Sequence, residues 1–101
     1  MDDFSIDALD DVIHGRLRLG VMAYLSTAGS ADFPLLKTKL QATDGNLSVQ
    51  LRKLEEAGYV AIEKGYAGRK PQTTVTLTAV GRAAYIAYLD ALKKLIAGSG
   101  G

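Results

Sequence analysis

The sequence contains no cysteine and only one histidine among its 101 residues, and both scarcities limit its chemistry. Without a thiol, the chain has no disulfide, no thiolate zinc site and no cysteine nucleophile. His14 has no carboxylate or second histidine at a metal-binding spacing. A glycine-rich phosphate loop is missing as well, since the glycines of segment 65–68 precede no predicted helix. We therefore predict no catalytic residue, no metal and no cofactor.

Long apolar runs are also absent. No stretch approaches the ~20 residues that a transmembrane helix requires, and the N-terminal segment MDDFSIDALDD lacks the basic and apolar regions of a signal peptide. These features predict a cytoplasmic protein without membrane contact. Hydrophobic residues still make up 48% of the chain, which is too many for a disordered protein, and the length suits one domain.

The net charge of +1 hides an uneven distribution of charged residues. Residues 1–11 carry five aspartates and no cation, whereas residues 37–82 carry eight cations against four acids. A locally basic surface attracts polyanions, so this middle segment favours a nucleic-acid partner.

The most informative pattern runs from Asp44 to Ala57. Leu47, Leu51 and Leu54 recur at helical spacing, so one face of the predicted helix is apolar. Its opposite face is polar and cationic, as expected for a helix that lies in a DNA groove. The candidate DNA contacts on this helix are Gly45, Asn46, Ser48, Val49, Gln50, Arg52 and Lys53.

These candidates are of two kinds, those suited to contact bases and those suited to contact phosphates. Asn46 and Gln50 each offer a donor and an acceptor to adenine N6 and N7, although Gln50, at the flank of the face, alternatively reaches a phosphate. Val49 suits a thymine methyl group. Phosphates position a protein without specifying sequence, and the candidates for them are Ser48, Arg52 and Lys53. The alternative interpretation is an ordinary solvated helix face.

Neighbouring segments predict the frame around this helix. Pro34 suits a first helical position, so a helix from Pro34 to Leu40 precedes a turn over residues 41–43. Either Thr43 or Asp44 caps the helix that follows. Further elements are predicted over residues 6–12 (helix), 16–27 (helix) and 31–33 (extended).

After Gly58 the apolar residues begin to alternate, which predicts strands. Two strands, Tyr59–Glu63 and Thr74–Thr78, are joined by a loop from Gly65 to Gln72. Glycine and proline in this loop bend and stiffen it, so that its cations project, and a narrow minor groove attracts such cations. The candidate DNA contacts here are Lys64, Arg69 and Lys70. Alternatively, a basic hairpin tip only keeps a sheet edge soluble.

The last predicted helix, which Thr78 caps and which runs to about Ala97, carries more than one apolar stripe. One stripe can pack on helix 16–27, and a second exposed stripe is typical of a twofold interface. We therefore predict a homodimer with the interface residues Ile6, Leu9, Tyr85, Ile86, Leu89, Leu92, Leu95 and Ile96. The alternative is a monomer in which Phe4, Ile6 and Leu9 cover the second stripe within one chain.

Three segments carry a family resemblance: HGRLRLGVMAYL, DFPLLKTKL and DGNLSVQLRKLEEAGYVAIEKGYAGRKPQTTVTLTAVGRAA. Over residues 12–96 they are similar to the winged-helix regulators of prokaryotes, in particular the small MarR- and ArsR-like proteins. Arg18 matches a position where such proteins keep an arginine that braces the fold or touches phosphate. ArsR-like metal sensors use cysteine and histidine clusters, which this chain lacks.

The resemblance implies a mainly α fold with a small antiparallel β wing. It implies one domain over residues 1–97, with a helix-turn-helix at about 34–57, a wing at about 59–78 and a C-terminal dimerisation helix at about 79–97. The glycine-rich residues 98–101 predict a flexible tail.

The resemblance also implies a function. In such proteins the second helix of the helix-turn-helix enters the major groove, and the wing contacts the minor groove or the backbone. The hypothesis is a sequence-specific transcriptional regulator that binds double-stranded DNA and is not an enzyme. Its alternative is a winged-helix protein-interaction module without DNA binding. We expect no separate sensor domain. A small-molecule effector, which no feature indicates, would then have to occupy a pocket near the dimer interface.

Overall fold

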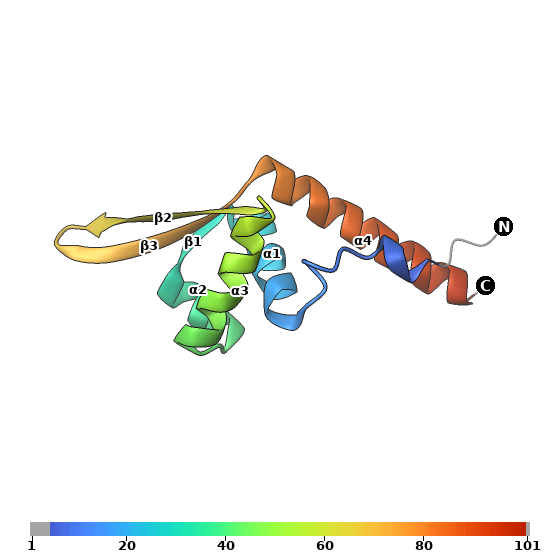
Figure 1. Cartoon of the computed structure of the whole chain (residues 1–101), viewed down its shortest axis with the longest axis horizontal. Helices are drawn as coiled ribbons and strands as arrows, with labels where there is room; N and C mark the ends of the chain where they lie inside the picture. The colour runs from blue at the N-terminus through green and yellow to red at the C-terminus, as the bar shows by residue number, and fades with distance from the viewer. Residues whose placement is uncertain (1–4, 101) are drawn as a thin grey trace.

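The computed structural model describes residues 5–100. The first part of the chain is mostly helical, and a β-hairpin and one long helix follow it (Figure 1). The hairpin and the last helix project in opposite directions, which makes the molecule 59 Å long but only 25 × 21 Å across. In chain order the elements are η1 (Ile6–Ala8, a 3₁₀ helix), α1 (Arg16–Ala28), β1 (Ser30–Asp32), α2 (Phe33–Leu40), α3 (Asp44–Glu56), β2 (Val60–Ala67), β3 (Lys70–Leu77) and α4 (Ala79–Gly100).

Side-chain caps mark the starts of three helices. The Asp32 carboxylate accepts a backbone N–H of α2 at 2.9 Å. The hydroxyl of Thr43 accepts the N–H of Asn46 at 3.2 Å, and that of Thr78 accepts the N–H of Gly81 at 2.9 Å. Each cap satisfies a helix N–H that has no partner within the helix. The predicted caps at Thr43 and Thr78 are therefore confirmed.

The hydrophobic core lies where α1, α3 and the sheet meet. Leu47, Leu51 and Leu54 of α3 are buried, as their spacing predicts. They pack with α1, whose buried residues include Val21 and Leu25. This burial determines which face of α3 remains outside.

The sheet is antiparallel with the order β1-β3-β2. Val60 lies opposite Leu77 and Ile62 opposite Val75, so the predicted apolar faces do meet. The predicted open loop from Gly65 to Gln72 is wrong, because pairing continues to Ala67 and Lys70. Gly68 has a φ of +65° and is the first residue of a two-residue turn. A glycine-first turn of this kind closes a hairpin tightly, so the strands extend to the tip.

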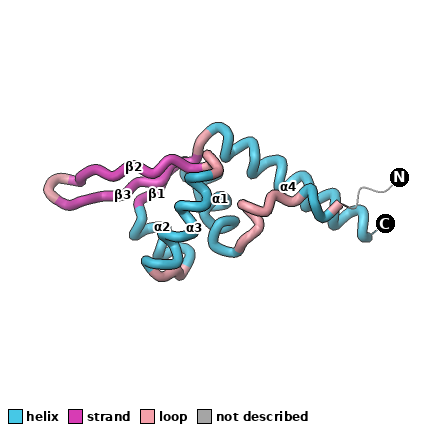
Figure 2. Tube along the Cα trace, viewed as in Figure 1, coloured by secondary structure: helices cyan, strands magenta, loops and turns pink. Residues whose placement is uncertain are grey.

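The predicted helix over residues 6–12 is also wrong, since only the single turn of η1 forms. The carboxylate of Asp10 accepts the backbone N–H groups of Val12 at 2.8 Å and Ile13 at 3.2 Å. Such local side-chain bonds compete with helix formation. The chain instead runs beside α4, as Figure 2 shows.

The last helix is longer than predicted. It continues through Gly100, so that residues 98–100 of the predicted tail are helical, and Gly101 lies outside the described residues. Despite the 22 residues of α4, no helix in the described part of the chain is both long and apolar enough to cross a membrane.

Gly81 brings the start of α4 against the junction of α3 and β2. A Cβ at this position would lie 2.8 Å from the carbonyl carbon of Tyr59 and nearer still to its oxygen. The Thr78 hydroxyl donates to the carbonyl of Gly58 at 2.7 Å, which reinforces the same approach. Because the obstructing atoms belong to the backbone, they cannot rotate away.

We expect Gly81→Ala to lower the free energy of unfolding by about 1–3 kcal/mol, since the methyl group forces two backbone segments apart. Urea unfolding followed by circular dichroism measures this loss. Gly45→Ala is the matched control, because a Cβ there meets no atom within 4 Å. That control should be neutral or stabilising by up to about 1 kcal/mol. Equal losses in both variants would contradict the close approach.

Candidate nucleic-acid interface

The outer face of α3 is the first part of the candidate interface. Burial of the three leucines turns the opposite face of the helix to solvent. Val49 remains 49% exposed, although it is a large apolar side chain. Of the seven predicted contact residues on this helix, Gln50 alone is half-buried, and the exposed ones are Gly45, Asn46, Ser48, Val49, Arg52 and Lys53.

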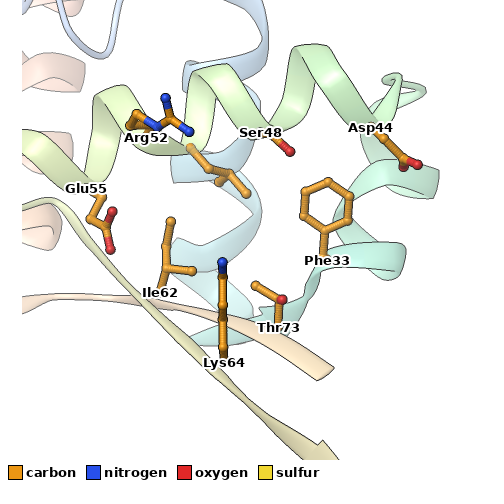
Figure 3. A pocket seen from close by; sticks show the side chains of 9 residues that line it. Phe33, Asp44, Ser48, Arg52, Glu55, Ile62, Lys64 and Thr73 are labelled. Carbon is orange, nitrogen blue, oxygen red and sulfur yellow. The ribbon is translucent and has the colours of Figure 1, made fainter. Parts of the chain in front are cut away.

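A groove of about 780 Å³ separates α3 from the sheet. The apolar residues that line it are Phe33, Leu51 and Ile62. Figure 3 shows Arg52 on α3 and Lys64 extending from β2 toward the helix, so the two sides of the groove each supply a cation. Two hydroxyl groups add hydrogen-bonding capacity, those of Ser48 and Thr73.

Two carboxylates also line this groove, and they differ in their partners. Asp44 forms an ion pair with Lys37 at 2.9 Å. Glu55, in contrast, takes part in no ion pair within residues 5–100. The groove therefore has two cations, Arg52 and Lys64, and one unpaired acid, Glu55, so its charge is positive on balance.

The β2–β3 hairpin extends well beyond the body of the domain (Figure 1). Arg69 lies in the turn and Lys70 begins β3, and both side chains are exposed. Tyr66, two residues before the turn, is 75% exposed. The hairpin tip thus presents two cations and an aromatic ring to solvent.

A chain of hydrogen bonds connects the body of the protein to α3. Arg18 on α1 donates through Nε to the carbonyl of Val12 at 2.5 Å, and another guanidinium N–H donates to Oε1 of Gln50. Gln50 in turn donates through Nε2 to Oδ1 of Asn46 at 3.2 Å. Arg18 therefore braces the fold, one of the two roles that the family resemblance implies. No pattern in the sequence pairs Arg18 with Gln50.

The N-terminal segment, whose Val12 carbonyl accepts the bond from Arg18, is itself held in place by Tyr59. The Tyr59 hydroxyl donates to the carboxylate of Asp10, which joins this segment to the junction of α3 and β2. The hydrogen bond to that carboxylate, together with burial and the negative charge of Asp10, raises the pKa of Tyr59 to about 12. The N-terminal segment is thereby part of the framework behind α3.

His14 contacts Tyr88 of α4. Its Nδ1 is hydrogen-bonded to the hydroxyl of Tyr88 at 2.7 Å. Tyr88 is buried on α4, and this burial, with the nearby Tyr85, raises the pKa of its hydroxyl. The histidine links the N-terminal segment to the last helix.

A helix pair, a three-stranded antiparallel sheet and a long hairpin are the parts of a winged helix. A family model described as a winged helix DNA-binding domain matches residues 17–96. The chain belongs to this family. The resemblance to winged-helix regulators that the sequence suggested is confirmed, and so is the predicted fold class.

Individual proteins agree with this assignment. An uncharacterised protein of Methanocaldococcus jannaschii is 33% identical over 84 residues, which cover 83% of this chain and 91% of that protein. A solved transcriptional regulator homologue from Pyrococcus horikoshii OT3 is 34% identical with a TM-score of 0.81, over 86% of each chain. Overoxidized AbfR bound to DNA shares the fold at 24% identity and a TM-score of 0.66, over 74% of this chain and 54% of AbfR.

The winged-helix assignment makes the chain a DNA-binding protein of the transcriptional-regulator type, a class that is generally not enzymatic. The predicted DNA contacts then lie in four places rather than in one patch. Arg52, Ser48 and Lys64 converge on the groove beside the wing. Lys53 lies on the other side of α3, beside Asp11 and Arg18. Two further groups occupy the N-terminal half of α3 and the hairpin tip.

The predicted dimer residues also separate. Leu9 is only 7% exposed, so it belongs to the core of its own chain and its assignment to the interface was wrong. The N-terminal segment buries it beside α4, as the monomer alternative proposes for this residue, whereas Phe4 lies outside the described residues. Ile86 and Leu89 nevertheless remain 60% and 43% exposed. Of the others, Ile6 and Ile96 are exposed, whereas Tyr85, Leu92 and Leu95 are half-buried.

The Tyr59–Asp10 bond makes a testable prediction about alkaline pH. A raised pKa means that the folded state favours the protonated hydroxyl. The stability from this bond is therefore complete below pH 10 and is lost as the pH rises toward about 12. In a spectrophotometric tyrosine titration, we expect Asp10→Asn to move one ionisation down from about 12 toward 10.

Tyr59→Phe is the control that assigns this ionisation, because it removes the same phase from the titration while leaving the other four tyrosines. An unchanged titration in Asp10→Asn would show that the carboxylate does not hold the hydroxyl.

Proposed function

We propose that the chain is a sequence-specific transcriptional regulator that inserts α3 into the major groove and lays the β2–β3 hairpin along the adjacent minor groove or backbone. The observation that carries this proposal is the groove between α3 and the hairpin, which has a cation on each side. Membership of a DNA-binding family supports the choice of partner.

Duplex geometry explains why such a groove suits DNA. One sugar–phosphate strand separates the major groove from the neighbouring minor groove. A protein that occupies both grooves must hold this strand between its helix and its wing. Arg52 and Lys64 would contact the phosphates from the two sides, and the hydroxyls of Ser48 and Thr73 would add neutral hydrogen bonds.

Base contacts would come from the N-terminal half of α3. Asn46 and Val49 are exposed there, and the absence of a side chain at Gly45 lets the helix approach the bases closely. Recognition helices of helix-turn-helix proteins commonly use their N-terminal residues for base edges. Arg69 and Lys70 at the hairpin tip would contact the minor groove or its phosphates.

The proposed regulator is a homodimer joined through α4. Its exposed apolar residues Ile86 and Leu89 lie about 60° apart around the helix axis and form one exposed stripe. A long helix projecting away from the domain, as in Figure 2, leaves this stripe accessible to a second copy. Two copies would present their α3 helices to half-sites about 34 Å apart, one turn of DNA.

Selection from a random duplex library with the purified protein tests the function. We expect enrichment of a motif with two similar half-sites in inverted orientation. Failure to enrich any motif at low and at physiological salt would favour the protein-interaction alternative instead.

The groove predicts how affinity depends on salt. Arg52→Gln and Lys64→Gln should each weaken binding to the selected site and reduce the slope of log K against log salt by about 0.9. Glu55→Gln should strengthen binding, because it removes the unpaired negative charge from the groove. Lys93→Gln is the control, since that exposed cation lies on α4. An equal loss from Lys93→Gln would contradict a phosphate site in the groove.

The stripe on α4 predicts the oligomeric state. Combined substitution Ile86→Asp and Leu89→Asp should convert a dimer to a monomer in light scattering and weaken DNA binding. Because both side chains are exposed within one chain, the monomer should remain folded by circular dichroism. Ala87→Asp serves as the charge control, because Ala87 is also exposed but its side chain points about 100° away from that of Ile86 around the helix axis. A dimer that survives the double substitution would place the interface elsewhere.

A further inference from the structure

The hydrogen-bond chain from Arg18 to Asn46 has a direction that arginine imposes. A guanidinium group has N–H donors and no acceptor. The end of Gln50 that faces Arg18 must therefore be the carbonyl oxygen Oε1, which leaves Nε2 to donate onward. Asn46 receives this bond on Oδ1. Its oxygen is thus engaged, while Nδ2 has no protein partner in the part of the chain that the structure describes.

Arg18 is held tightly enough to impose this direction. Its Nε donates to the Val12 carbonyl at 2.5 Å, and Nη2 lies 3.5 Å from the Asp11 carbonyl. The guanidinium also lies over Gly15, where a Cβ would come within 2.6 Å of Nη2. A side chain bonded on one side and covered on another has few other rotamers available.

The direction of this hydrogen-bond chain determines whether Asn46 presents a donor or an acceptor to DNA. A free asparagine amide rotates to match adenine, which presents one acceptor and one donor in the major groove. Rotation of Asn46 would bring its Nδ2 against Nε2 of Gln50, so that two donors would face each other. Asn46 therefore meets the duplex chiefly as a donor. Guanine is the base whose major-groove edge presents two acceptors, N7 and O6.

We propose that Arg18, acting through Gln50, fixes Asn46 as a hydrogen-bond donor and so selects guanine rather than adenine at the base that Asn46 contacts. Arg18 and Gln50 are positioning residues in this scheme, and Asn46 makes the contact. The inference rests on the proposed insertion of α3 into the major groove. It replaces the adenine contact that residue type alone predicts for Asn46. It also means that Gln50 cannot contact adenine with both its oxygen and its nitrogen, because its oxygen is bound by Arg18.

One substitution should reverse the hydrogen bond between residue 50 and Asn46. In Gln50→Glu, both oxygens of the carboxylate accept and neither donates. One oxygen would keep the bond from Arg18, and the other would accept from Nδ2 of Asn46. Asn46 would then present Oδ1 to the duplex and favour a base with an exposed amino group, cytosine or adenine. Gln50→Met preserves the length of the side chain but leaves the Asn46 amide free to rotate.

Library selection with four proteins tests this inference: the natural sequence, Asn46→Ala, Gln50→Glu and Gln50→Met. Loss of preference in Asn46→Ala identifies the base position concerned. There we expect guanine over adenine by roughly five- to a hundredfold for the natural sequence, the range of a good paired contact. Gln50→Glu should shift the preference to cytosine or adenine, and Gln50→Met should bring guanine and adenine within a few-fold of each other.

The outcomes separate this inference from the proposed function. A motif with adenine at that position, or one unchanged by Gln50→Glu, overturns the positioning role and leaves the regulator intact. A natural sequence that selects no motif overturns both.

A measurement without DNA tests the hydrogen-bond chain directly. In NMR spectra of the free protein, Gln50→Met should shift the side-chain amide resonances of Asn46. Ser48→Ala is the control, since Ser48 is exposed on the same helix and is not part of the chain. Asn46 resonances that stay in place in Gln50→Met would overturn the inference, whatever the DNA selection gives.

Discussion

Burial of the leucine face of α3 is the constraint on which the rest of the structure depends. Leu47, Leu51 and Leu54 each lose nearly all contact with water, and each buried leucine contributes roughly 1.5–3 kcal/mol relative to exposure. This free energy sets the rotation of α3 about its own axis. Because successive residues point about 100° apart, that rotation also turns the polar residues outward. The candidate DNA surface is therefore a consequence of core packing.

The N-terminal segment supports α3 from behind, although it lies far from it in the sequence. Asp10 bonds to Tyr59 at the junction of α3 and β2, and the carbonyl of Val12 holds Arg18. His14 joins the same segment to Tyr88 on α4. One short stretch thus connects α3 to α4, the helix that carries the exposed apolar stripe.

The accuracy of the sequence-based predictions depends on the range of the interactions involved. Caps at Thr43 and Thr78 are local, and the leucine and strand periodicities are local, so these elements were confirmed. The predicted helix over residues 6–12 failed because Asp10 bonds to its own neighbouring backbone, which periodicity does not register. The hairpin loop was predicted too long because the charge and glycine content of residues 65–72 obscured a two-residue turn.

The sequence by itself determined the kinds of element, the polar face of α3 and the basic hairpin, since each follows from residues within one or two helical turns or one hairpin. Only the tertiary structure decided which cations share a groove, that Leu9 is buried in its own chain and that Gln50 meets Arg18. Arg18 and Gln50 are 32 residues apart, on different helices. Their contact depends on how α1 and α3 pack and rotate against each other, which the whole core sets and no local pattern encodes.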